Sequence, residues 1–167
     1  MRLSLRPGRL FMDYRAITAE YLLQRGIRLL LCDLDYTLAP RCVKEPDEQV
    51  HNWIASMHDA GITVMIVSNN RNPVRVERFC APLGIPYEGN AGKPGTRGIC
   101  HAMERVGVTK KETAMLGDKL LTDMLAANLA GITGLMVEPL GGAVTPWQKV
   151  LHALQAPFKC FPIEKTC

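Results

Sequence analysis

The feature that most constrains this chain is an apolar run at residues 29–32 that ends in two carboxylates, Asp33 and Asp35. A buried strand can contain the run, but a protein core does not accommodate unpaired charges, so the carboxylates are expected where the strand leaves the core. Residues two apart in a strand point to the same side, so the pair should converge beyond the strand's carboxyl end and attract a cation. A polar turn that caps the strand is the simpler alternative, because Asp is common in turns.

Further short apolar runs alternate with helical segments along the chain. Strands are predicted at residues 28–33, 62–67, 85–87, 113–116 and 132–137, and helices at residues 16–25, 47–60, 73–81, 95–106, 122–130 and 146–154. Continuous apolar runs are typical of parallel strands covered on both faces, although short buried helices would give the same pattern. The alternation predicts an α/β fold: a three-layer α/β/α sandwich with right-handed crossovers around a parallel, Rossmann-like sheet.

Polar residues follow the predicted strands, at the end of a parallel sheet where ligands bind. In chain order they are Ser68, Asn69, Lys93, Asp118 and Asp123, the last two belonging to a Gly-Asp-x-x-x-x-Asp stretch. Together with the Asp-x-Asp-x-Thr stretch at residues 33–37, they resemble the four motifs of the haloacid dehalogenase-like (HAD) hydrolase superfamily, in order. The resemblance covers residues 26–139.

The resemblance implies phosphoryl transfer with Mg²⁺ as the cofactor. Asp33 would be the nucleophile that forms an aspartyl-phosphate, and Asp35 would protonate the leaving oxygen and then activate water. Mg²⁺ prefers oxygen ligands, and those implied are Asp33, the backbone carbonyl of Asp35, and Asp118. The residues implied to hold the phosphoryl oxygens are Ser68, Asn69 and Lys93, and those implied to support the metal ligands from behind are Thr37 and Asp123.

Several of these residues have simpler interpretations. Lys93 taken alone would be a solvated loop lysine, and Thr122 with Asp123 could merely cap a helix. Arg71 and Asn72 are interpreted as a helix cap rather than as substrate contacts. The histidines have no metal-ligand spacing, so surface or packing roles are expected for His51, His58, His101 and His152.

HAD enzymes for small metabolites usually contain a cap domain, and this sequence has no room for one. Residues 38–46 separate the first motif from the next helix, and one helix and one short strand use residues 68–93. An open site implies a substrate or a second subunit that covers it from outside. The chain most resembles subfamily IIIA phosphatases of the YqeG type, which are related to mitochondrial phosphatidylglycerophosphatases. It departs from them at Tyr36, where asparagine is expected, and at Lys119, where glutamine is usual. Lys119 adds a cation near the metal loop that is expected either to contact substrate or to stay solvated, and solvation is slightly favoured.

The 167 residues, 47% of them apolar, suffice for one domain. A chain of this length buries about 70% of its unfolded surface. The expected parts are an N-terminal arm and helix (1–25), a catalytic core (26–139) and a C-terminal helix and tail (140–167). The six cysteines form no CxxC pair and no apolar stretch approaches the length of a membrane span, so a reduced, cytoplasmic location is expected.

The N-terminal segment is rich in arginine. Six arginines face two acidic residues within residues 1–28: Arg2, Arg6, Arg9, Arg15, Arg25 and Arg28. A solvated basic tail is one interpretation. The other is an arm on an anionic membrane surface, with the apolar residues in the interface: Leu10, Phe11, Met12 and Tyr14. An anionic lipid head group, such as that of phosphatidylglycerophosphate, is therefore a predicted partner, whereas nucleic acid is not.

The predicted function is a Mg²⁺-dependent phosphatase that acts on a phosphate monoester. The alternatives are a HAD scaffold that binds or regulates without turnover, a phosphatase of a soluble or macromolecular phosphate, and a phospho-acceptor receiver domain. A receiver domain would share the acidic pocket and the lysine. It should lack Asp35, because that residue supplies the acid and base that release the phosphate.

Overall fold

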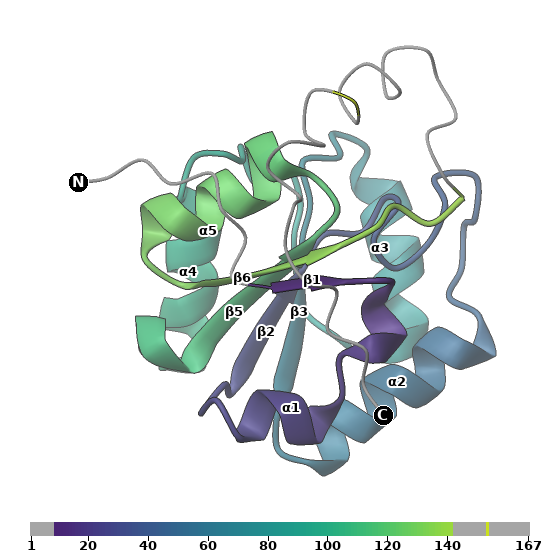
Figure 1. Ribbon diagram of the computed structural model, residues 1–167. Helices are drawn as coiled ribbons and strands as arrows, with labels where there is room; N and C mark the ends of the chain where they lie inside the picture. The colour runs from purple at the N-terminus through teal and green to yellow at the C-terminus, as the bar shows by residue number, and fades with distance from the viewer. Residues whose placement is uncertain (1–8, 142–152, 154–167) are drawn as a thin grey trace.

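The computed structural model describes residues 9–141 and residue 153. Within these residues, six parallel strands form one sheet in the order β1-β6-β5-β2-β3-β4 (Figure 1). The strands are β1 (Arg9–Phe11), β2 (Leu29–Cys32), β3 (Thr63–Val67), β4 (Tyr87–Glu88), β5 (Thr113–Gly117) and β6 (Thr133–Val137). The predicted α/β fold with a parallel, Rossmann-like sheet is confirmed.

The central strand β2 is covered on both faces, which explains its continuous apolar run. Leu30 and Cys32 belong to one core cluster, and Leu29 and Leu31 belong to another. The first cluster contains residues of α1 (Ala19–Leu23), α2 (Glu48–Asp59) and α3 (Pro73–Cys80), and the second contains residues of α4 (Arg97–Val106) and α5 (Leu125–Ala130). The three-layer sandwich follows, with α4 and α5 together beside one face of the sheet in Figure 1.

Short polar side chains cap the N-termini of α2 and α3. The side chain of Asp47 accepts a hydrogen bond from the backbone N–H of Val50 and so begins α2. Asn72 does the same for the N–H of Arg75 at the start of α3, with Pro73 as the first helical residue. The predicted cap of this helix is confirmed for Asn72.

Several predicted boundaries are wrong. Strand β1 was not expected, because three residues within an arginine-rich segment give little strand signal. The helix predicted at residues 16–25 is a 3-10 turn, Tyr14–Ala16, followed by the short α1. The helix predicted at 122–130 begins earlier, with a π-helical turn, Leu120–Met124, before α5. Apart from residue 153, the helix predicted at 146–154 lies outside the described residues.

The position of β1 also corrects the membrane prediction for the apolar residues of the N-terminal segment. Leu10, Phe11 and Tyr14 are 5%, 1% and 3% exposed. Leu10 and Phe11 belong to β1, which extends the sheet beside β6, and Tyr14 lies in the 3-10 turn that follows. Met12 is exposed. In the part of the chain that the structure describes, no helix is both long and apolar enough to span a bilayer.

No cap domain is evident in residues 9–141, as predicted. The chain reaches α2 from β2 through a loop, and residues 68–93 contain only α3, a 3-10 turn and β4. Residues 9–141 therefore leave the carboxyl edge of the sheet open.

Candidate active site

Three central strands bring polar residues to the same edge of the sheet. Cys32 of β2 pairs with Ile66 of β3 and with Leu116 of β5, so the segments that follow these strands emerge side by side. Asp33, Ser68 and Asp118 lie in those segments, and all three are buried. A cavity of about 310 Å³ opens there, lined by Asp33, Asp35, Tyr36, Arg41, Ser68, Asn69, Asn70, Lys93, Lys119 and Thr122.

Lys93 lies between two carboxylates at the bottom of the site. Its Nζ is 3.0 Å from Oδ1 of Asp33 and 2.6 Å from Oδ1 of Asp123, and its side chain is 2% exposed. Burial alone would lower the pKa of Lys93, but the two carboxylates outweigh it and raise the pKa. Lys93 is therefore a charged residue of the site, and its interpretation as a solvated loop lysine is wrong.

Asn69 positions the loop that contains Lys93. Its amide Nδ2 donates to the backbone carbonyl of Lys93, and its Oδ1 accepts from the backbone N–H of Lys93, both at 2.8 Å. These two hydrogen bonds fix the lysine's backbone against the end of β3. Asn69 also lines the cavity, and its contact with a phosphoryl oxygen remains a prediction.

Lys119 is not simply solvated, contrary to the prediction. Its Nζ lies 2.8 Å from Oδ1 of Asp118, 3.2 Å from Oδ2 of Asp33 and 3.3 Å from the backbone oxygen of Asp35. Burial would lower the pKa of Lys119, but the nearby carboxylates raise it overall. A second ammonium therefore contacts the acidic cluster.

The two ammonium groups control the ionisation of the nucleophile candidate. Burial would raise the pKa of Asp33, but Lys93 and Lys119 together hold it below its ordinary value. Burial has the larger effect at Asp118, where it raises the pKa to about 6 despite the opposing charge of Lys119. Of these two carboxylates, Asp33 is thus the one better prepared to remain ionised.

Asp35 is held by two residues that the sequence interpretation missed. Asn70 Nδ2 donates to its Oδ2 at 2.8 Å, and Arg75 Nη2 donates to its Oδ1 at 3.2 Å. The arginine also contacts the backbone oxygen of Pro40 at 3.5 Å, and only 9% of its side chain is exposed. Asn70 follows Asn69 directly and could have been suspected, but nothing in the sequence around Arg75 distinguishes it from a surface arginine.

Thr37 and Asp123 lie behind the cavity, where they contact other site residues. Thr37 Oγ1 donates to Oδ1 of Asp118 at 3.1 Å. Asp123 is fully buried, pairs with Lys93 and accepts the backbone N–H of Lys119 at 3.1 Å. Asp123 therefore does more than cap a helix, because it also closes the loop that contains Asp118.

Tyr36 adopts a left-handed backbone conformation, with φ at 70°. This region is unfavourable for a bulky residue and is better tolerated by asparagine, the residue expected from the family pattern. Two hydrogen bonds of 2.8 Å hold it, one from its N–H to the oxygen of Ala39 and one from the N–H of Leu140 to its own oxygen. Tyr36 is one of the residues that line the cavity.

The residues at this edge fit a hard divalent cation. One oxygen from each of Asp33, Asp118 and Asp123 lies within 4.8 Å of the others, and no other such group of acidic, histidine or cysteine ligands occurs among the described residues. The backbone oxygen of Asp35 is a further candidate metal ligand, because it contacts the same Lys119 ammonium as the carboxylates of Asp33 and Asp118. An all-oxygen set is what Mg²⁺ prefers.

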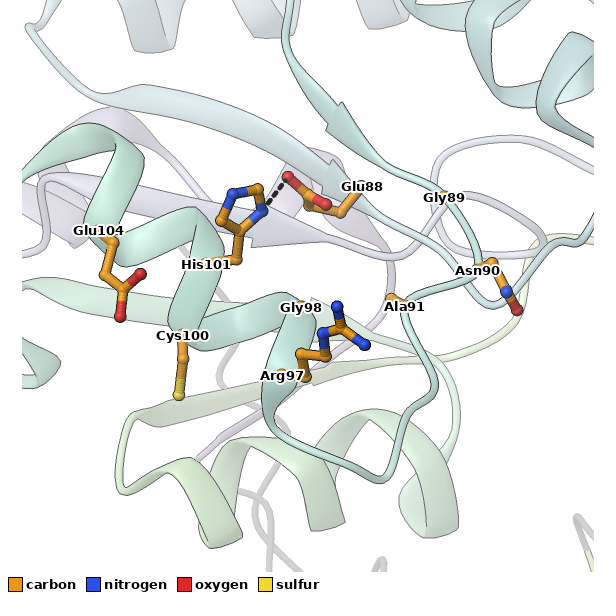
Figure 2. Close-up of a pocket in the computed structure, with 9 residues that line it drawn as sticks. All are labelled: Glu88, Gly89, Asn90, Ala91, Arg97, Gly98, Cys100, His101 and Glu104. Carbon is orange, nitrogen blue, oxygen red and sulfur yellow. Dashed lines mark hydrogen bonds and ion pairs between the residues drawn. The ribbon is translucent and has the colours of Figure 1, made fainter.

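A larger cavity lies elsewhere and lacks this chemistry. Its volume is about 580 Å³, and the residues that line it, drawn in Figure 2, come from the end of β4, the start of α4 and the loop between them. His101 Nδ1 is 2.9 Å from Oε1 of Glu88, and Cys100 points away from that pair. The structure thus supports the surface role predicted for His101.

Comparisons with known proteins identify the family of the chain. Residues 40–131 match the family model described as haloacid dehalogenase-like hydrolase. The chain is 35% identical over 127 residues to "Probable phosphatase YqeG" of Bacillus subtilis (strain 168), a match that spans 76% of this chain and 73% of the Bacillus protein.

Solved structures share the fold. The cobalt-bound form of the deoxy-D-mannose-octulosonate 8-phosphate phosphatase of Haemophilus influenzae has a TM-score of 0.57 at 20% identity, covering 82% of this chain and 94% of that one. The 3-deoxy-D-manno-octulosonate 8-phosphate phosphatase of Moraxella catarrhalis, in complex with magnesium, phosphate and KDO, has a TM-score of 0.52 at 14% identity, covering 81% and 90%. At these identities the likeness concerns the fold alone.

Proposed function

We propose that this chain, which belongs to the haloacid dehalogenase-like hydrolase family and is a phosphoric monoester hydrolase, acts through a covalent phosphate on Asp33 with Mg²⁺ as its cofactor. The observation that best supports the proposal is the placement of Asp33. Its carboxylate faces the cavity and contacts the ammonium groups of Lys93 and Lys119. In the metal-free protein both charges keep Asp33 ionised, and Lys93 also offsets the repulsion that an incoming anionic ester would meet.

Catalysis proceeds in two steps. A carboxylate oxygen of Asp33 attacks the phosphorus, the bond to the leaving oxygen breaks, and the proton of Asp35 moves to that oxygen. Asp35 then takes a proton from water, which attacks the phosphorus of the acyl phosphate and releases inorganic phosphate with Asp33 restored. The position of Asp35 on the cavity wall, beside Asn70, is compatible with both transfers.

Ser68 and Lys93 hold the phosphoryl oxygens. An ammonium has three N–H donors, and two of those on Lys93 serve Asp33 and Asp123. The third can donate to a phosphoryl oxygen. Ser68 Oγ accepts from the backbone N–H of Asn70 at 3.1 Å, which leaves its own O–H to donate into the cavity.

Asp33, Asp118 and the backbone carbonyl of Asp35 would hold the metal ion. When bound, Mg²⁺ would supply positive charge that offsets the negative charge of the ester. Thr37 fixes the carboxylate of Asp118 for this role, and Asp123 fixes the loop behind it.

The substrate we propose is a phosphate on a protruding lipid head group, such as that of phosphatidylglycerophosphate. Three features support this: the open cavity, the resemblance to subfamily IIIA phosphatases of the YqeG type, and the exposed arginines Arg9 and Arg41. Because Leu10, Phe11 and Tyr14 are buried, the contact would be electrostatic, at the inner face of a membrane, with the membrane itself covering the site.

A phosphatase assay tests the chemistry. Wild-type protein should hydrolyse an aryl phosphate with Mg²⁺ and lose that activity in chelator. Asp33→Asn should lose both turnover and the acid-stable phosphate label, because an amide cannot form the acyl phosphate. Asp59→Asn, at an exposed position of α2, is the matched control and should behave as wild type. Wild-type turnover by Asp33→Asn would contradict the mechanism.

Vesicle binding tests the substrate class separately. The protein should sediment with phosphatidylglycerol vesicles but not with phosphatidylcholine vesicles, less so at high salt and after Arg2→Ala, Arg6→Ala and Arg9→Ala together. It should release phosphate faster from vesicles that contain phosphatidylglycerophosphate than from glycerol 3-phosphate. Hydrolysis of the soluble ester alone would remove the lipid proposal and leave the phosphatase intact.

A further inference from the structure

Lys119 contacts the same three groups that are assigned to the metal ion. Its Nζ lies 2.8 Å from the Asp118 carboxylate, 3.2 Å from the Asp33 carboxylate and 3.3 Å from the backbone oxygen of Asp35. The ammonium therefore occupies the space among these oxygens that a cation ligated by the same groups would need. A divalent ion among the same oxygens would also repel the ammonium at short range.

From this geometry we infer that the Lys119 ammonium and the divalent cation are alternative occupants of one site, so that the metal binds only as Lys119 leaves. The inference rests on the proposed function, because it takes Asp33, Asp35 and Asp118 as the metal ligands. It goes further in assigning Lys119 a role that neither a solvated lysine nor a fixed structural ion pair would have.

The two lysines of the site differ in their freedom to move. Lys93 has 2% of its side chain exposed and is locked between Asp33 and Asp123, whereas Lys119 has 39% exposed and lines the cavity. The Nζ of Lys119 lies 5.9 Å from the centre of the Tyr36 ring, an aromatic face that can receive a displaced ammonium. Lys93 is therefore the fixed cation and Lys119 the removable one.

The exchange has two consequences. When no metal is bound, the positive charge of Lys119 offsets the negative charges of Asp33 and Asp118, so these carboxylates can remain close together. It also lowers the affinity for the metal, because binding must first break the contacts of the ammonium.

Metal affinity is the direct test, measured by the loss of the electron paramagnetic resonance signal of free Mn²⁺ during titration. Lys119→Gln and Lys119→Met should bind Mn²⁺ roughly 10- to 100-fold more tightly than wild type, the range expected for removing one hydrogen-bonded charge contact. Lys111→Gln removes the same charge from an exposed position ahead of β5 and should leave the affinity unchanged. Unchanged affinity in both Lys119 variants would overturn the exchange.

Thermal unfolding gives a second readout that does not depend on activity. In chelator, Lys119→Gln should unfold at a lower temperature than wild type, because Asp33 and Asp118 lose a neutralising charge, and Mg²⁺ should raise its Tm by more than it raises that of wild type. Lys119→Arg keeps the charge and should resemble wild type. Equal Mg²⁺-induced shifts in Lys119→Gln and wild type would contradict the exchange while leaving the phosphatase proposal intact. If none of the proteins binds Mn²⁺ or responds to Mg²⁺, the metal site itself is wrong and the exchange fails with it.

Discussion

The carboxylate of Asp123 lies directly against Gly117, so that a β-carbon on residue 117 would overlap its side-chain atoms. Asp123 cannot move away freely, because it binds the ammonium of Lys93 and the backbone N–H of Lys119. The last residue of β5 is therefore a glycine for reasons of space.

Gly117→Ala should destabilise the protein by about 1–3 kcal/mol, because overpacking a buried site forces shifts in its neighbours. It should also lower activity, since the displaced group is the partner of Lys93. Urea unfolding and the aryl phosphate assay measure the two effects. Gly89→Ala is the control, because its added methyl group would meet no atom within 4 Å. Unfolding at the same urea concentration for both variants would contradict the packing argument.

Asn69→Ala should reduce turnover by releasing the backbone of Lys93, which Asn69 holds through two hydrogen bonds of 2.8 Å. The free energy of unfolding should fall by about 1–2 kcal/mol, the usual effect of losing partly buried hydrogen bonds. Asn52→Ala, at an exposed position of α2, serves as the control. If Asn69→Ala kept full kcat, Lys93 would not need this support.

Asp35→Asn should slow turnover by roughly 10²- to 10⁴-fold, the usual contribution of a general acid and base. Because Asp33 remains, an aryl phosphate with a good leaving group should still label the protein, and the label should persist longer than in wild type. Rapid-quench labelling measures both. A variant that neither turns over nor labels would place Asp35 in binding rather than in proton transfer.

Calcium should inhibit the magnesium-activated enzyme. The donors offered here are carboxylate and carbonyl oxygens, which accept both ions, but Ca²⁺ takes a larger and more flexible shell and would misplace Asp33 relative to the phosphorus. Competition assays at fixed Mg²⁺ measure this effect. Equal activity in chelator and in Mg²⁺ would remove the metal from the mechanism.

Asp13 should contribute a small, pH-dependent stabilisation of the N-terminal segment. Its carboxylate accepts hydrogen bonds from the side chain and the backbone of Arg15, which lower its pKa below the ordinary 3.8. A lowered pKa in the folded state means that the contribution is present above pH 4 and is lost as the pH falls through the folded-state pKa. Asp13→Asn should therefore cost no more than about 1 kcal/mol at pH 7, since Arg15 is half exposed, and less at pH 3. Thermal unfolding across this range measures the difference, and a constant gap would contradict the ion pair.

The fold, and the placement of Asp33 and Ser68 at the edge of the sheet, could be predicted because they depend on short-range signals. Continuous apolar runs mark strands covered on both faces, and the residue after each run must lie at the edge of the sheet, as it does for Asp33 and Ser68. Strand β1 has no such signal, because an edge strand of three residues with an exposed arginine resembles a loop.

The contacts of the longer side chains could not be predicted. Lys119 and Arg75 both have long, flexible side chains. The ammonium of Lys119 contacts Asp33 and Asp35, which lie 86 and 84 positions away in the sequence. The guanidinium of Arg75 contacts Asp35, which lies 40 positions away. Which carboxylate such a group contacts depends on the relative positions of loops that only the folded sheet defines. The left-handed conformation of Tyr36 could not be predicted for the same reason, because it is held by hydrogen bonds with the backbone of Ala39 and of Leu140.

The open edge of the sheet also bears on the kinetics of the catalytic cycle. Residues 9–141 contain no segment that must swing over the bound ester before reaction or lift away afterwards. In many enzymes the opening of such a lid limits the overall rate. A cycle that involved only this part of the chain would be limited by encounter, chemistry or the departure of phosphate rather than by the movement of a lid. Selection among phosphates would then depend on where the protein and its substrate meet.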